Sequence, residues 1–266
     1  MKAPSHPHRP VLQRIAVIVA VSVQIGSTFL PQLGFGEPIG SRSDSVRTLV
    51  TPAGWAFAIW GPLFLGSAIF AIWQALPGQK ASALLDRIAW PAAIAFAAQG
   101  VWAVYTQFAN LTVISVAIIL ASLIGLLVTL RALSKTSELS TQERWLAALV
   151  LGAMAAWLTA ASIVNISAAL VYHGVFASDA GSAGYPLLAA VIVAVGGVIA
   201  ATAVYRSRGN PWYALVFCWA LLAIYLRGGQ EAAELATAAV GSGLLVIVAM
   251  IAGLAHRENR RHWLGL

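Results

Sequence analysis

The chain has 266 residues, of which 60% are hydrophobic and only 9% are charged, and its mean hydropathy is +0.83. Soluble domains carry about 25% charged residues, so these few charges could not cover a globular surface in water. The apolar stretches are about 20 residues long, which suits membrane-spanning helices and is twice the length of a barrel strand. We therefore expect an all-α integral membrane protein whose main partner is the lipid bilayer.

The net charge of +7 does not point to nucleic acid as a partner. The basic residues are dispersed at the ends of apolar runs instead of being gathered in one patch. The sequence also contains no His-rich metal pattern, no paired carboxylates at catalytic spacing and no nucleophile motif. We expect no nucleic-acid partner, no metal, no catalytic residue and no required cofactor.

Apolar runs follow one another along the chain. They cover residues 11–31, 52–76, 88–108, 111–131, 145–172, 185–205, 211–226 and 236–255. The seventh run is short, so seven spans with one tilted or re-entrant segment are the alternative to eight. We divide the chain into a cytoplasmic tail (1–10), a five-span core (11–172), a linker (173–184), a three-span extension (185–255) and a basic cytoplasmic tail (256–266).

The basic residues are distributed unequally between the two sides of the membrane. With the N-terminus inside, all but three of the 16 lie on the cytoplasmic side, and those three are Arg42, Arg47 and Arg227. This bias follows the positive-inside rule for eight spans with both termini inside, whereas seven spans would break it. We expect a multi-pass protein of the cytoplasmic (inner) membrane.

The connections between the runs differ in character. The longest, residues 32–51, is rich in glycine and serine and lies outside, where it is either a mobile lid or an ordinary solvated loop. The link around Ala109–Asn110 is so short that the third and fourth runs must form a tight hairpin. Arg227, Glu231 and Glu234 cluster before the last run and predict a surface ion pair at i, i+4 spacing.

The ten tryptophans divide into two sets. One set lies near the predicted cytoplasmic ends of the runs and fits an interfacial belt: Trp73, Trp90, Trp145, Trp212 and Trp263. The other lies deeper: Trp60, Trp102, Trp157 and Trp219, with Trp55 at the rim. Lipid gains nothing special from deep indoles, whereas a bulky flat ring with one N–H donor suits the wall of a pocket for a flat apolar ligand.

Helical spacing groups the deep indoles with further aromatic or polar residues on shared faces. Because a polar side chain in lipid is costly, Gln99 and Asn165 should point inward beside the indoles, and the small Ala161 leaves space there. The predicted ligand-binding residues are Trp55, Phe57, Trp60, Phe64, Gln99, Trp102, Trp157, Ala161 and Asn165. The alternative is that Gln99 and Asn165 hydrogen-bond across helix contacts while the indoles fill core volume.

At these residues the chain resembles the tryptophan-rich sensory protein family, also called the TspO/MBR or translocator protein family. The family's Pro-x-Gly-Trp-x-Phe-x-x-x-Trp run is similar to Pro52, Gly54, Trp55, Phe57 and Trp60, with one residue fewer before the second Trp. Its third-helix Asn-x-x-Trp is approximated by Gln99 and Trp102, and its fifth-helix Trp and Asn by Trp157 and Asn165. The resemblance covers about residues 11–172, and three additional spans follow.

The resemblance implies a five-helix bundle with a ligand pocket open beneath the first loop. It also implies binding of porphyrins, haem-type tetrapyrroles or sterols, light-dependent porphyrin breakdown involving pocket tryptophans, and a homodimer. We expect a membrane receptor, sensor or carrier for a flat hydrophobic ligand. The alternative is a secondary transporter of a small amphipathic solute, although no run carries a charged residue at mid-membrane.

Overall fold

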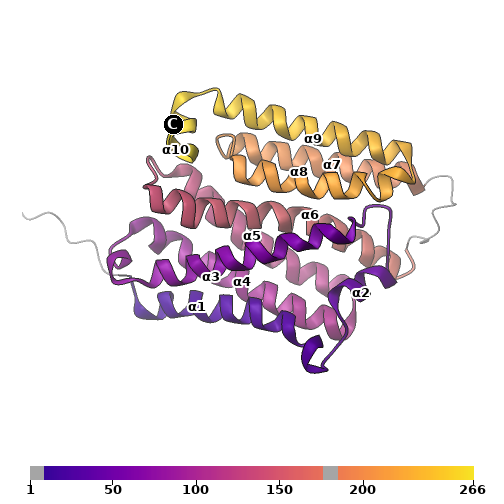
Figure 1. Ribbon diagram of the computed structural model, residues 1–266, viewed down its shortest axis with the longest axis horizontal. Helices are drawn as coiled ribbons and strands as arrows, with labels where there is room; N and C mark the ends of the chain where they lie inside the picture. Colours follow the sequence, from indigo (N-terminus) through magenta and orange to yellow (C-terminus); the bar gives the residue numbers. More distant parts are fainter. Residues whose placement is uncertain (1–8, 176–184) are drawn as a thin grey trace, which may run out of the picture.

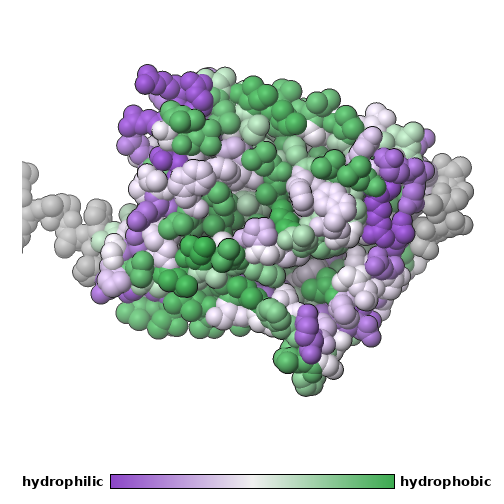
Figure 2. Space-filling view, viewed as in Figure 1, coloured by the Kyte–Doolittle hydropathy of each residue, from purple (hydrophilic) through white to green (hydrophobic). Residues whose placement is uncertain are grey.

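The protein, described by a computed structural model over residues 9–175 and 185–266, is a bundle of helices lying side by side (Figure 1). Within these residues every regular element is helical. The α-helices are α1 (Val11–Gly26), α2 (Ile39–Ser45), α3 (Trp60–Ala75), α4 (Ala83–Ala109), α5 (Val113–Lys135), α6 (Leu149–Tyr172), α7 (Tyr185–Arg206), α8 (Pro211–Tyr225), α9 (Ala233–Leu254) and α10 (Arg257–Leu264). Apolar side chains cover the middle of the bundle and hydrophilic ones gather at its two ends (Figure 2).

Seven helical segments of the described residues are long and apolar enough to cross a membrane. The prediction of an all-α protein with multiple membrane spans is confirmed. The segment predicted as the seventh span is the exception, because α8 has 15 residues and gives about 22 Å of regular helix at 1.5 Å per residue. A bilayer core is about 30 Å thick.

The buried helix α6 lies between two groups of helices (Figure 1). On one side it packs against α3 and α5, which belong with α1 and α4 to the predicted five-span core. On the other side it packs against α7 and α8, and α9 packs against both of these. Tyr213 on α8 donates a 2.7 Å hydrogen bond to the hydroxyl of Thr159 on α6, which ties the two groups together inside the bundle.

The chain ends described by the structure are packed against the bundle. Arg9, which the prediction placed in the N-terminal tail, is buried and donates hydrogen bonds to the backbone oxygen (2.9 Å) and side-chain oxygen (2.7 Å) of Gln74 at the end of α3. Burial lowers the pKa of Arg9 to about 10, so it stays charged at neutral pH and suits the carbonyl end of a helix. The C-terminal segment forms α10.

Two tryptophans assigned to an interfacial belt are buried instead. Trp263 on α10 has no exposed surface, and its indole N–H donates to the carbonyl of Ser207 at 3.0 Å. Trp73 is 5% exposed and donates to Gln142 at 3.2 Å. The belt assignment was wrong for these two because depth along a run does not reveal which residues pack against another segment.

We call the end of the bundle that carries residues 27–53 the first-loop end. There, the chain between α2 and α3 is held by hydrogen bonds with the C-terminal helices. The amide of Ala53 donates to the carbonyl of Ala223 on α8 at 3.1 Å. The indole of Trp219, also on α8, donates to the carbonyl of Ala56 at 3.2 Å. The segment before α3 has no α-helical ladder of hydrogen bonds, since Gly54–Ile59 is a 3₁₀ helix. Helix α8 supplies hydrogen-bond partners to this segment.

Close packing of the first loop predicts that alanine changes stability differently at Gly228 and at Gly241. A Cβ at Gly228 would overlap the carbonyl oxygen of Leu49, whereas a Cβ at Gly241 would meet no atom within 4 Å. Gly228→Ala should cost about 1–3 kcal/mol of stability through overpacking. Gly241→Ala should leave stability unchanged or raise it slightly, because alanine favours helix. Thermal unfolding of both variants in detergent checks this, and equal midpoints would contradict the close packing at Gly228.

Candidate functional site

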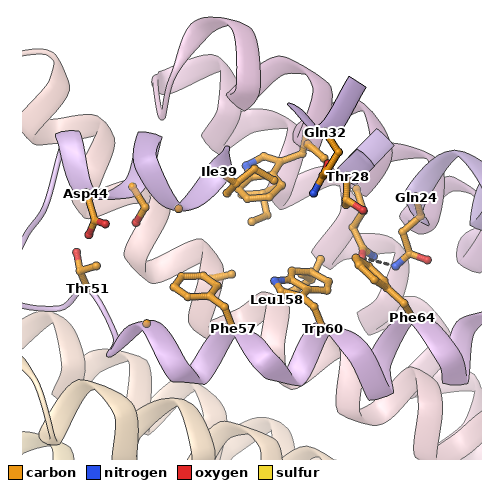
Figure 3. Close-up of a pocket in the computed structure, with 18 of the residues that line it drawn as sticks. Gln24, Thr28, Gln32, Ile39, Asp44, Thr51, Phe57, Trp60, Phe64 and Leu158 are labelled. Carbon is orange, nitrogen blue, oxygen red and sulfur yellow. Dashed lines mark hydrogen bonds between the residues drawn. The ribbon is translucent and has the colours of Figure 1, made fainter. Parts of the chain in front are cut away.

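A cavity of about 710 Å³, here called the main cavity, lies at the first-loop end among α1, α3, α4 and the first loop (Figure 3). The surface is hollowed between α1 and α3 close to α2 (Figure 2). The residues that line the cavity are Gln24, Thr28, Gln32, Ile39, Gly40, Ser43, Asp44, Thr51, Gly54, Phe57, Trp60, Phe64, Gln99, Trp102, Ala103, Ile119, Leu158, Ala161 and Arg227.

Aromatic rings from α3 and the segment before it form one wall. Phe57, Trp60 and Phe64 project from the same side of the chain toward the cavity (Figure 3). The rings of Trp60 and Phe64 stack with centroids 5.0 Å apart. Trp157 on α6 meets Trp60 edge-on at 6.0 Å and Phe57 edge-on at 6.1 Å, a geometry that aromatic quadrupoles favour. These contacts between rings hold Phe57, Trp60 and Phe64 in place beside the cavity.

Two glutamines from α1 and α4 form a polar part of the cavity. Gln24 donates through Nε2 to Oε1 of Gln99 at 2.7 Å, and both side chains are at least 95% buried (Figure 3 draws this bond). The sequence analysis predicted Gln99 and missed Gln24. The signal available was a glutamine in the middle of a mostly apolar run, but its partner is 75 positions away and could not be assigned from spacing.

A second, smaller cavity of about 50 Å³, here called the side pocket, adjoins the main cavity. Ile39, Ser43, Phe57, Trp102 and Ala161 line both spaces. The rest of its wall comes from Pro52, Leu111, Trp157, Ala160, Val164, Asn165, Ala220 and Ile224. Since Ala220 and Ile224 belong to α8, this space is completed by a helix outside the predicted five-span core.

The structure brings most of the predicted ligand-binding residues together. Phe57, Trp60, Phe64, Gln99, Trp102 and Ala161 line the main cavity, and Trp157 and Asn165 line the side pocket. Trp55 lines neither: it is 43% exposed and packs edge-on against Trp219, with ring centroids 4.8 Å apart. Contact with a ligand stays a prediction for all of these residues.

The first loop covers the mouth of the main cavity with ordered structure, including the short helix α2. Asp44 at the end of α2 pairs with Arg227 at 3.3 Å, and Arg227 also donates to the carbonyl of Pro52 at 3.1 Å. Arg47 pairs with Glu231 at 2.6 Å. The predicted pairing within the cluster of Arg227, Glu231 and Glu234 was wrong: Arg227 and Glu231 each pair with the first loop instead.

Fold and cavity together define a multi-span helical membrane protein with an aromatic cavity at one end of its bundle. Residues 10–252 match the family model described as TSPO-like protein, so the chain belongs to the TSPO-like protein family and is an integral membrane protein. The match continues through α7 and α8 into the last turn of α9, beyond the residues 11–172 that carried the resemblance in sequence. No curated protein and no solved structure matches the chain.

The two ion pairs at the mouth should differ in their effect on the loop. Arg227→Gln should raise hydrogen exchange at the Ala53 amide several-fold, because Arg227 is only 23% exposed and also bonds the preceding carbonyl of Pro52. Arg47→Gln should change it by less than about twofold, since both partners are nearly half exposed and such pairs contribute about 0.2–1 kcal/mol.

Hydrogen exchange followed by mass spectrometry on peptides containing Ala53 measures this difference. A larger effect from Arg47→Gln than from Arg227→Gln would contradict the assignment of Arg227 as the main ionic contact between the first loop and the segment that follows α8. Arg87→Gln serves as a control, because Arg87 lies at the other end of α4 and, within residues 9–175 and 185–266, its side chain bonds only the carbonyl of Ala83 in its own helix.

Proposed function

We propose that this protein is a membrane receptor or carrier that binds a flat hydrophobic ligand, of the tetrapyrrole or sterol class, in the main cavity. The observation that carries the proposal is the aromatic wall of Phe57, Trp60 and Phe64 on a cavity of about 710 Å³. Cavities for small molecules measure about 300–1,000 Å³ and are mostly apolar with a few polar groups. A planar ring system would lie against this wall and exclude water from it.

The few polar groups suit a ligand with an apolar body and a polar edge. Among the described residues that line the main cavity, only Asp44 and Arg227 carry formal charges, and they pair with each other at the mouth. Gln24 and Gln99 supply amide groups deeper inside, and Oε1 of Gln24 has no hydrogen-bond partner among the described residues. The acidic groups of a porphyrin would therefore face Arg227, and its rings the indoles.

Binding is favoured over ion-coupled transport by the position of the charges. In the described spans, every charged side chain lies within the first or last two turns of its helix, as Asp86 and Arg131 do. Coupling of transport to protons or sodium ordinarily uses ionisable groups near mid-membrane. Uptake that responds to an ion gradient would support the transporter alternative.

We infer the orientation of the protein from its charge pattern. With both termini in the cytoplasm, the first-loop end lies outside, and the main cavity lies in the outer half of the membrane. The ligand would then be taken from the outer leaflet or from the space beyond it.

Replacing cavity indoles should weaken binding of a porphyrin. Trp60→Ala and Trp102→Ala each remove a large apolar contact worth about 1.5–3 kcal/mol, which is roughly a 10- to 100-fold loss of affinity. Titration of mesoporphyrin IX with the purified protein, followed by the shift of the porphyrin absorbance band, measures this.

Trp145→Ala is the matched control, because Trp145 is 45% exposed and packs against Trp212 near the start of α8, outside both cavities. The affinity of the Trp145→Ala variant for the porphyrin should equal that of the parent protein. Equal affinities in all three variants would place the binding site elsewhere and would contradict the proposal.

A further inference from the structure

The side pocket holds more hydrogen-bond donors than the protein satisfies. The indole N–H groups of Trp102 and Trp157 and the amide nitrogen of Asn165 are shielded from solvent, and none finds an acceptor among the described residues. Trp157 is 3% exposed and Asn165 is 2% exposed. All three side chains line the same space of about 50 Å³. A buried donor without an acceptor is unfavourable, so this grouping indicates a missing partner.

The chemistry of these groups determines what that partner is. An indole N–H only donates, and the Asn165 oxygen already accepts a hydrogen bond from Ser115 at 2.9 Å. A water molecule could accept from the indoles, but it would bring two donors of its own into a pocket that is poor in acceptors. A bare acceptor oxygen on a ligand satisfies the indoles and adds no donor.

The charge of the pocket narrows the ligand further. None of the described residues that line it is a lysine, arginine or histidine. A buried carboxylate without a cation is strongly unfavourable, whereas a neutral carbonyl needs only hydrogen-bond donors. The pocket has room for a carbonyl group, since even one water needs only about 10–15 Å³. Apart from Ser43, the side chains of its remaining walls, including Ala220 and Ile224 of α8, are apolar.

We propose that the side pocket binds the oxygen of a neutral carbonyl group, such as a ketone, carried by the ligand whose flat body occupies the main cavity. This inference rests on the proposed function and specifies the polar group that the ligand carries. Trp102 lines both spaces, so a ring lying in the main cavity can extend its carbonyl into the side pocket without leaving the aromatic wall. Helix α8 completes the pocket.

A matched pair of probes tests the proposal. Fluorenone and fluorene have nearly the same flat tricyclic body and differ in one carbonyl oxygen. Their affinities are measured by equilibrium dialysis against the full chain in lipid nanodiscs, with partition into empty nanodiscs subtracted. Fluorenone should bind about tenfold more tightly than fluorene, which corresponds to about 1.4 kcal/mol.

Variants assign that preference to the side pocket. Trp157→Phe and Trp102→Phe remove an N–H and keep an aromatic ring, so each should reduce the ratio of the two affinities to about threefold or less. The ratio is the readout because a general loss of packing weakens both probes alike. Trp145→Phe makes the same change outside both cavities and should keep the tenfold ratio.

The outcomes separate this inference from the proposed function. Equal affinities of the parent protein for the two probes would overturn the carbonyl site and leave a receptor for flat apolar ligands standing. A tenfold preference that survives in both Trp157→Phe and Trp102→Phe would also overturn it. If fluorenone, fluorene and mesoporphyrin IX all fail to bind, the proposed function is overturned and the carbonyl site with it.

Discussion

The structure of the cavity depends on how the backbone amides and carbonyls of the segment before α3 find hydrogen-bond partners. Non-helical backbone at membrane depth is tolerated only where it is buried in protein or lines a water-filled cavity. Residues 46–53 are not helical, and two of their backbone groups find partners far along the sequence: Ala223 of α8 accepts from Ala53, and Arg227 just after α8 donates to Pro52. These bonds fix the start of α3, and with it the aromatic wall. Without α8, both the loop and the wall would lose their support.

The sequence predicted the part of the site that depends on local helical spacing. In the 3₁₀ helix Gly54–Ile59, side chains three apart are aligned, so Phe57 and Trp60 still share a face although the segment is not α-helical. The same geometry explains Trp55, which is two positions before Phe57, turns away from the cavity and packs on Trp219. The motif predicted the chemistry of this segment, but its turn geometry decided which rings face inward.

The sequence could not predict contacts that join distant segments. Gln24 meets Gln99, Asp44 meets Arg227, and Ala220 of α8 faces the side pocket. In each case the residue type gave a weak signal and the partner depended on the tertiary arrangement. The three C-terminal spans were predicted as an added extension. Their contacts with the first loop, and the family match up to residue 252, make them part of the same structural unit as the cavity.

The shortness of α8 has a consequence for the surrounding lipid. Leu215 and Leu222 are 58% and 47% exposed on a regular helix of about 22 Å, and irregular chain follows it from residue 226. Acyl chains cannot solvate such irregular backbone, so from hydrophobic mismatch we expect a thinner bilayer here than beside the 22-residue α9. Headgroups would then lie closer to the protein interior beside the helix that completes the side pocket than beside α9.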